Sequence, residues 1–152
     1  MRRAPDGAFA LIVDPLRFPA LFTGYGPIPS IQSVVLEMPL AVGATRRIHN
    51  SDGTVLTECV TSLDPPNHHG YTLAGFTAPF SWLVSKGHAD WHVIAENGGS
   101  RVQWRYDFTL AKAWLGPATW LLLKIFMARA MQRCLDNMAR ALDATPKQGA
   151  GP

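Results

Sequence analysis

Cysteine, long apolar runs and excess charge of one sign are all scarce in this sequence of 152 residues. Two cysteines, Cys59 and Cys134, are too few for a disulfide framework, so we expect a reducing, cytoplasmic compartment. No apolar run approaches the roughly 18 residues of a membrane span, so we expect a soluble protein. Fourteen basic against eleven acidic residues leave a net charge of +3, which argues against dense contact with nucleic-acid phosphates.

The composition predicts one folded domain. Hydrophobic residues make up 47% of the chain and charged residues 16%, which is too apolar for a disordered chain, and the length suits one core rather than two. We expect this domain to span 1–144 and a flexible tail, rich in Gly and Pro, to follow at 145–152. The basic start at 1–3 precedes only a short apolar stretch, so we interpret it as mature sequence rather than an export signal.

The first elements are short. The apolar run Ala8–Val13 predicts a strand. Asp14-Pro15 then offers an N-cap and a proline at the first helical position, which predicts a short helix through Phe22. Closely spaced Gly and Pro residues at 24–29 end that helix.

Later segments, each bounded by Gly, Pro, Asn or Asp, predict a run of antiparallel strands at 33–37, 44–49, 54–61, 70–76, 88–96 and 101–110. The last segment alternates most clearly, with apolar even-numbered and polar odd-numbered residues. A two-residue turn at Asn97-Gly98 or at Gly98-Gly99 pairs it with the segment before it. Either turn places Trp91 and Trp104 on one apolar face.

The loop around Asp52 decides a strand register. A two-residue turn at Asp52-Gly53 mixes polar and apolar residues on both faces of the hairpin, whereas a three-residue loop at 51–53, with Gly53 left-handed, separates them. We therefore predict the three-residue loop. It sets Arg46 opposite Glu58 and predicts an ion pair between them on the otherwise apolar inner face.

After Gly116-Pro117 the apolar period changes to about 3.6 residues, which predicts a long helix ending near Ala144. The side chains of its expected inner stripe are Trp120, Leu123, Met127, Ala130, Met131, Cys134, Met138 and Leu142. Lys124 interrupts that stripe, and either meets an anionic headgroup at a cavity mouth or reaches out to solvent along its stem.

The order of these elements is that of the helix-grip fold. The turn and core residues that carry a family resemblance lie at 43–46, 52–53, Glu58, 64–66, Tyr71 and 98–104. They resemble the SRPBCC or START-like superfamily, which includes the polyketide cyclase/dehydrase family and Bet v 1-like proteins. Residues 22–29 resemble a bacterial subgroup without a settled function. The resemblance covers about 8–144 and implies an α+β fold. In that fold a curved antiparallel sheet wraps around a long C-terminal helix, with short helices after the first strand.

Members of this superfamily enclose an apolar cavity between sheet and helix and bind lipids, sterols, polyketides or quinones, and some cyclise polyketides. The resemblance therefore implies ligand contacts from residues expected on the inner face: Arg46, Glu58, Tyr71, Trp91, Trp104, Tyr106, Phe108, Met127 and Met131. The residues alone leave two other interpretations open. The rings and methionines also suit packed core, and Arg46 with Glu58 also suits a purely structural ion pair.

Other chemistries find little support. His88 and His92 share a strand face but lie four residues apart, about 13 Å, which is too far for both to bind one metal ion. The histidines at 68–69 are interpreted as part of a turn. We therefore expect no metal site. No Gly-x-Ser-x-Gly nucleophile elbow occurs, and the glycines at 24–26 lack the rest of a dinucleotide loop, so we expect no catalytic nucleophile and no cofactor. The strand at 101–110 turns its arginines outward and its rings inward, which argues against nucleic acid as a partner.

We therefore predict a protein that binds a hydrophobic small molecule, such as a lipid, a quinone or a polyketide-like aromatic, in a cavity between the sheet and the C-terminal helix. One alternative is a cyclase- or dehydratase-like enzyme in which Arg46, Glu58 or a tyrosine assists proton transfer. Another is an interaction module that docks a partner, a second copy or a membrane through an apolar surface. The residues of that surface are Trp114, Leu115, Leu121, Leu122, Ile125 and Phe126. The segment at 78–86 could instead cover this surface.

Overall fold

Six antiparallel strands form one sheet whose spatial order follows the chain, β1-β2-β3-β4-β5-β6. The computed structural model describes residues 4–76, 81, 84–112 and 116–144, so the tail expected at 145–152 lies outside the described residues. The elements are α1 (Pro5–Val13), the 3₁₀ helix η1 (Phe18–Ala20), β1 (Ile31–Leu36), β2 (Thr45–Asn50), β3 (Val55–Asp64), β4 (His68–Ala74), β5 (Val84–Glu96), β6 (Gly99–Leu110) and α2 (Gly116–Ala144).

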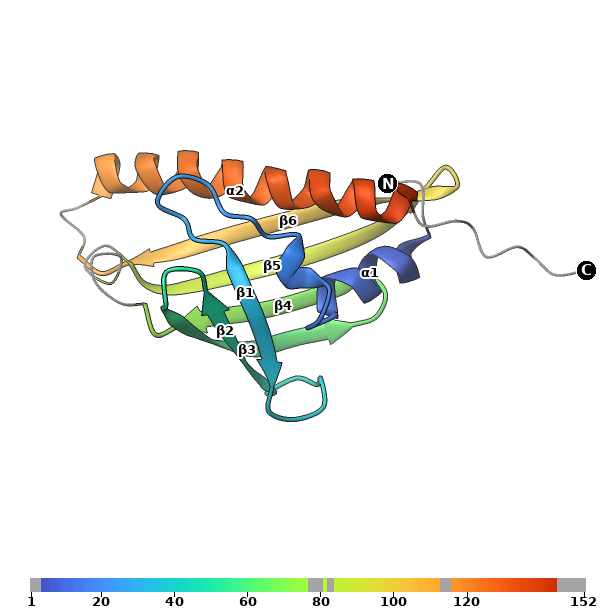
Figure 1. Ribbon diagram of the computed structural model, residues 1–152, viewed down its shortest axis with the longest axis horizontal. Coiled ribbons are helices and arrows are strands. Elements are labelled where there is room, and N and C mark those ends of the chain that lie inside the picture. Colours follow the sequence, from blue (N-terminus) through green and yellow to red (C-terminus); the bar gives the residue numbers. More distant parts are fainter. Residues whose placement is uncertain (1–3, 77–80, 82–83, 113–115, 145–152) are drawn as a thin grey trace, which may run out of the picture.

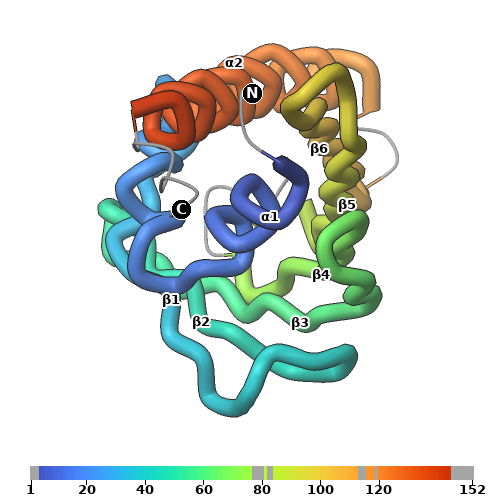
Figure 2. Tube along the Cα trace, turned by 90° about the vertical axis from the view of Figure 1, so that its right-hand side faces the viewer, coloured from blue at the N-terminus to red at the C-terminus, as the bar shows by residue number. Residues whose placement is uncertain are grey.

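The sheet curves and the two α-helices close it. In Figure 1, α2 runs along the length of the molecule, and α1 lies beneath its C-terminal half. Figure 2 shows the strands as an open curve with α1 inside it and α2 across the opening. This curved antiparallel sheet with one long C-terminal helix confirms the predicted α+β helix-grip class.

The first element is a helix, so the strand expected at Ala8–Val13 is wrong and the short helices precede β1 rather than follow a strand. Pro5 occupies the first helical turn, a position that tolerates its missing N–H. The buried positions follow helical spacing: Ala8, Phe9, Leu11 and Ile12. A short, continuously apolar run has no period that separates a buried helix from a buried strand, which explains the error.

Asp14 ends α1 instead of starting a helix that reaches Phe22. It precedes Pro15, and a residue before proline is driven out of the helical region; Asp14 has ψ 112°. Its carboxylate still caps the chain that follows, because Oδ1 accepts hydrogen bonds from the backbone N–H groups of Leu16 (2.9 Å) and Arg17 (3.2 Å). The capped segment is a turn followed by η1.

The β2–β3 hairpin has the predicted three-residue loop. Gly53 has φ +84°, and its N–H donates to the Asn50 carbonyl over 3.1 Å. Arg46 lies directly opposite Glu58, as expected. Gly53 supplies the left-handed conformation that any residue with a Cβ adopts at a cost.

The β5–β6 hairpin turns at Asn97-Gly98, the first of the two predicted alternatives. Both residues have positive φ, 39° and 79°, which matches the right-handed twist of the flanking strands. Trp91 pairs with Trp104 on the inner face, and β6 alternates between half-buried and exposed residues along most of its length. The predicted apolar wall is therefore confirmed.

Helix α2 buries its stripe only from Leu123 onward; the side chains at most 6% exposed are Leu123, Ala130, Cys134, Met138 and Leu142. Trp120, which we expected on the inner stripe, is 54% exposed. Among the described side chains of α2, the buried stripe begins about one turn later, at Leu123. Lys124 is also exposed, and its Nζ lies 4.4 Å from the Trp120 ring centroid. None of the described helices is both long enough and apolar enough to cross a membrane.

Candidate functional site

A cavity of about 210 Å³ lies against the inner face of the sheet, and residues from the end of α1, the segment before β1 and α2 complete its wall. Most of the residues expected at a ligand line it: Arg46, Glu58, Tyr71, Trp91, Trp104, Tyr106, Phe108 and Met127. Met131 does not belong to the lining. It lies about one turn further along α2 than Met127, which does line the cavity.

Aromatic rings in contact with one another form part of the cavity wall. The rings of Trp91 and Trp104 stack with centroids 4.0 Å apart and planes 15° from parallel. Phe22 meets Trp104 edge-on at 6.0 Å, and Tyr106 lies 4.7 Å from Phe108. Rings held by one another in this way offer a planar ligand a surface that is ordered before binding.

A buried ion pair interrupts this apolar wall. Arg46 and Glu58 are 5% and 3% exposed. Arg46 Nε donates to Glu58 Oε1 over 2.7 Å, and its Nη2 contacts the same oxygen. Arg46 also donates from Nη1 to the Val13 carbonyl (3.4 Å) and from Nη2 to His69 Nε2 (3.3 Å). The predicted pair is therefore present, and it ties the end of α1 to the sheet.

The ionisable groups of the cavity are shifted by burial. Burial raises the pKa of Glu58, and the adjacent Arg46 charge opposes that rise. Burial also raises the pKa of Tyr71 and of Tyr106 well above that of a free phenol. Both tyrosines are thus neutral hydroxyl groups at physiological pH, able to donate one hydrogen bond each.

His69 is the polar residue that the sequence reasoning missed. It is fully buried on β4, whereas we expected it in a turn. Burial, together with the neighbouring Arg46 charge, lowers the pKa of His69 to about 3, so its ring is neutral and Nε2 accepts from Arg46. The signal was present in the alternation of β4, where an inward residue at 71 implies another at 69.

The segment before β1 also contributes residues that were not expected in the lining: Asp14, Phe18, Phe22, Pro27, Ile28 and Pro29. Its last residues are joined to the β2–β3 loop, because the Ser51 N–H donates to the Ser30 carbonyl (2.9 Å). Pro27 and Asp52 both line the cavity and are both exposed, so the cavity reaches the surface between these two loops. Nothing in the sequence signalled this role: the resemblance of 22–29 to relatives carried no expectation about the cavity.

The apolar surface expected at the start of α2 is exposed in part. Leu121, Leu122 and Ile125 are 45–56% exposed, but Phe126 is partly buried, with its ring centroid 6.1 Å from that of Tyr25. Trp114 and Leu115 lie outside the described residues, and the expected cover at 78–86 is described only at 81 and 84–86. Cys134 is not available as a nucleophile, since burial raises the pKa of its thiol to about 12.

The buried neutral His69 predicts a loss of stability in mild acid. The unfolded chain takes up a proton near pH 6.5, whereas folded His69 stays neutral down to about 3, so stability falls as the pH drops below 6.5. Between pH 7.5 and 5.0 we expect the free energy of unfolding to fall by about 2 kcal/mol more in the unsubstituted protein than in His69→Gln. Urea unfolding followed by tryptophan fluorescence measures both, and equal losses in the two proteins would contradict the assignment.

Comparisons with solved structures show the same fold. The structure is similar to Ara h 8.0201 (TM-score 0.67, 15% identity, 93% of this chain and 92% of that one). It is similar to the protein Ms6760 from Mycobacterium smegmatis (TM-score 0.64, 16% identity, 95% and 87%). It also matches the di-domain ARO/CYC BexL from the BE-7585A biosynthetic pathway (TM-score 0.68, 16% identity, 96% of this chain and 48% of that one).

At the level of sequence, no curated protein matches the chain significantly. The model of one protein family does match, over residues 1–143, and its description is polyketide cyclase / dehydrase and lipid transport. That match takes in the helix α1, the whole sheet and nearly all of α2, and thus every residue of the cavity wall. The chain belongs to the polyketide cyclase / dehydrase and lipid transport family.

Proposed function

We propose that this protein binds a compact hydrophobic molecule with one polar end, such as a quinone or a small polyketide-like aromatic, in the cavity between sheet and α2. One observation carries the proposal: a buried ion pair, Arg46 with Glu58, lies in the wall of a mostly apolar cavity. Apolar walls hold the body of a ligand, and a few fixed polar groups orient it.

The volume limits the size of the ligand. An apolar cavity of roughly 150 Å³ holds one benzene ring, and this cavity measures about 210 Å³. A ligand of one or two rings fits that space, and the stacked Trp91 and Trp104 offer a planar ligand a matching surface. We therefore favour a compact aromatic over a long-chain lipid among the classes that the family suggests.

The polar end of the ligand has partners in the wall. An arginine has five N–H donors, and Arg46 uses four of them in its contacts with Glu58, His69 and Val13. Among the described residues, the buried Trp104 Nε1–H has no acceptor. A ligand carbonyl or hydroxyl oxygen that accepts from these donors removes the cost of leaving them unpaired.

Filling the cavity tests the binding function. Met127→Trp places an indole in the lining, so we expect the affinity for 1-naphthol to fall at least about tenfold, as a volume loss in a small cavity requires. Leu122→Trp is the matched control, because it introduces the same ring on the exposed face of the same helix. Isothermal titration calorimetry measures both, and native mass spectrometry of the fresh protein shows whether a ligand is retained. Equal affinities for the two variants would contradict the proposal.

Removing the ion pair tests the orientation of the ligand. A single Arg46→Met substitution leaves Glu58 charged and unpaired, which costs about 3–5 kcal/mol of stability. The double variant R46M/E58L avoids this because both charges disappear together. We expect it to bind 1-naphthol about tenfold more weakly and 1-methylnaphthalene unchanged, since only the hydroxyl group needs the pair. Equal losses for both ligands would instead indicate damage to the cavity.

Tyr71 favours a second function, cyclisation of a polyketide-like substrate. Its neutral hydroxyl group lines the same cavity as the Glu58 carboxylate, which pairs a proton donor with a proton acceptor. The structural likeness to BexL, a di-domain ARO/CYC, agrees with this chemistry. New aromatic absorbance from a linear polyketone, formed by the unsubstituted protein and not by R46M/E58L, would establish turnover. Binding without product would leave the protein as a carrier.

Two exposed leucines on α2 favour the interaction function. Leu121 and Leu122 are 52% and 56% exposed side by side at the start of α2. Leu122→Asp is a sharper test of this surface than a change at the partly buried Phe126. A change in solution mass or in vesicle association without a change in 1-naphthol affinity would assign a docking role to the surface.

A further inference from the structure

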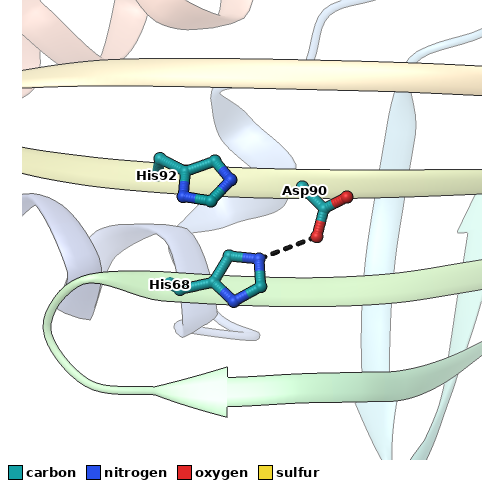
Figure 3. Close-up of side chains that lie close together, drawn as sticks. All are labelled: His68, Asp90 and His92. Atoms are coloured by element: carbon teal, nitrogen blue, oxygen red, sulfur yellow. Dashed lines mark hydrogen bonds and ion pairs between the residues drawn. The ribbon is translucent and has the colours of Figure 1, made fainter.

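Three titratable side chains meet on the outer face of the sheet, on the side away from the cavity. His68 on β4 pairs directly with His92 on β5, and Asp90 lies two residues before His92 on the same face. Figure 3 shows the two imidazole rings side by side with the Asp90 carboxylate next to them. From the sequence we expected no metal site, because His88 and His92 lie too far apart and His68 was placed in a turn. His68 lies on β4 instead, which brings it beside His92 and Asp90.

The distances suit one shared ion. His68, Asp90 and His92 each offer one ligand atom, and these atoms all lie within 4.8 Å of one another. His68 Nε2 and Asp90 Oδ1 are 2.7 Å apart, a hydrogen-bond distance; two atoms that bind one tetrahedral zinc ion at about 2.0–2.1 Å each are about 3.3 Å apart, so a small movement of either side chain admits the ion. His92 is exposed, so its ring can turn toward the other two without displacing core residues.

Neighbouring residues hold the first two groups in place. Ser62 Oγ lies 2.8 Å from His68 Nδ1, so the serine oxygen can accept a hydrogen bond from Nδ1–H, and in that tautomer the Nε2 lone pair is free for a metal. His88 Nε2 lies 2.9 Å from the other oxygen of Asp90. Opposite Asp90 stands Gly70, where a Cβ would come within 2.8 Å of Asp90 Oδ1. The absent side chain at Gly70 makes room for the carboxylate.

We propose that His68, Asp90 and His92 bind a divalent transition-metal ion of the zinc class on the outer face of the sheet. Two imidazole nitrogens and one carboxylate suit zinc, and disfavour the all-oxygen coordination of magnesium and calcium. The side chains of His68 and Asp90 are 24% and 23% exposed, so a bound ion keeps a coordination position open to water. The ion joins β4 to β5.

Zinc titration of the full chain tests the proposal. We expect one Zn²⁺ per chain by isothermal titration calorimetry and no binding of Mg²⁺ under the same conditions. His92→Gln and Asp90→Asn each remove one ligand and should weaken zinc binding at least about tenfold, while Ser62→Ala, which removes a supporting contact, should weaken it by about tenfold. Co²⁺ in place of zinc should give visible absorption without a thiolate charge-transfer band, which excludes Cys59 as the ligand.

His49→Gln is the matched control. His49 is a partly exposed histidine on β2, separated from β4 by β3, and has no place in the proposed site. We expect this variant to bind zinc like the unsubstituted chain, and zinc to raise the melting temperature of both but not that of His92→Gln. No binding by the unsubstituted chain, equal binding by His92→Gln, or an equal loss in His49→Gln would overturn the proposal.

Discussion

A buried arginine and glutamate, side by side in an apolar wall, constrain the structure around them. Each charge is tolerable only while the other is in place, because an unpaired charge at Arg46 or Glu58 would remain away from water. The two residues lie opposite each other in β2 and β3, so a slip of one residue between these strands would leave the two side chains on opposite faces of the sheet. The three-residue loop with left-handed Gly53 sets the register that keeps them together.

The same pair marks where packed core ends and cavity begins. α1 fills the curve of the sheet beneath the C-terminal half of α2, and its last carbonyl, at Val13, accepts a hydrogen bond from Arg46 (Figure 1). A helix C-terminus carries partial negative charge, which a guanidinium stabilises. The cavity begins at this point: Ile12 of α1 and Arg46 both line it, as does Met127 of α2. The ion pair thus lies where the cavity meets the end of α1, and one end of a bound ligand would reach it there.

Local patterns predicted the sheet well and the N-terminal region poorly. Alternation along β6 and turn chemistry at Gly53 and at Asn97-Gly98 are properties of a few neighbouring residues, so the two hairpins and the ion pair could be read directly. Whether Met127 or Met131 faces a cavity depends instead on how α2 lies over the sheet, which is a tertiary property. The apolar run at 8–13 fits a buried helix and a buried strand equally, so its element type could not be read from the sequence. His69 was missed because Pro65 and Pro66 were taken to extend the turn, whereas β4 already begins at His68.

Adjacent residues on β4 serve opposite faces of one sheet. His69 points to the ion pair and His68 to the outer cluster, because side chains alternate along a strand. The pairing of β4 with β5 shows the same alternation: His68 pairs with His92 on the outer face, and the neighbouring His69 pairs with Trp91 on the inner face. An ion held by His68 and His92 would therefore restrain the same two strands that carry Tyr71 and Trp91 in the cavity wall. The ion and the ligand would thus contact opposite faces of the same two strands through different side chains.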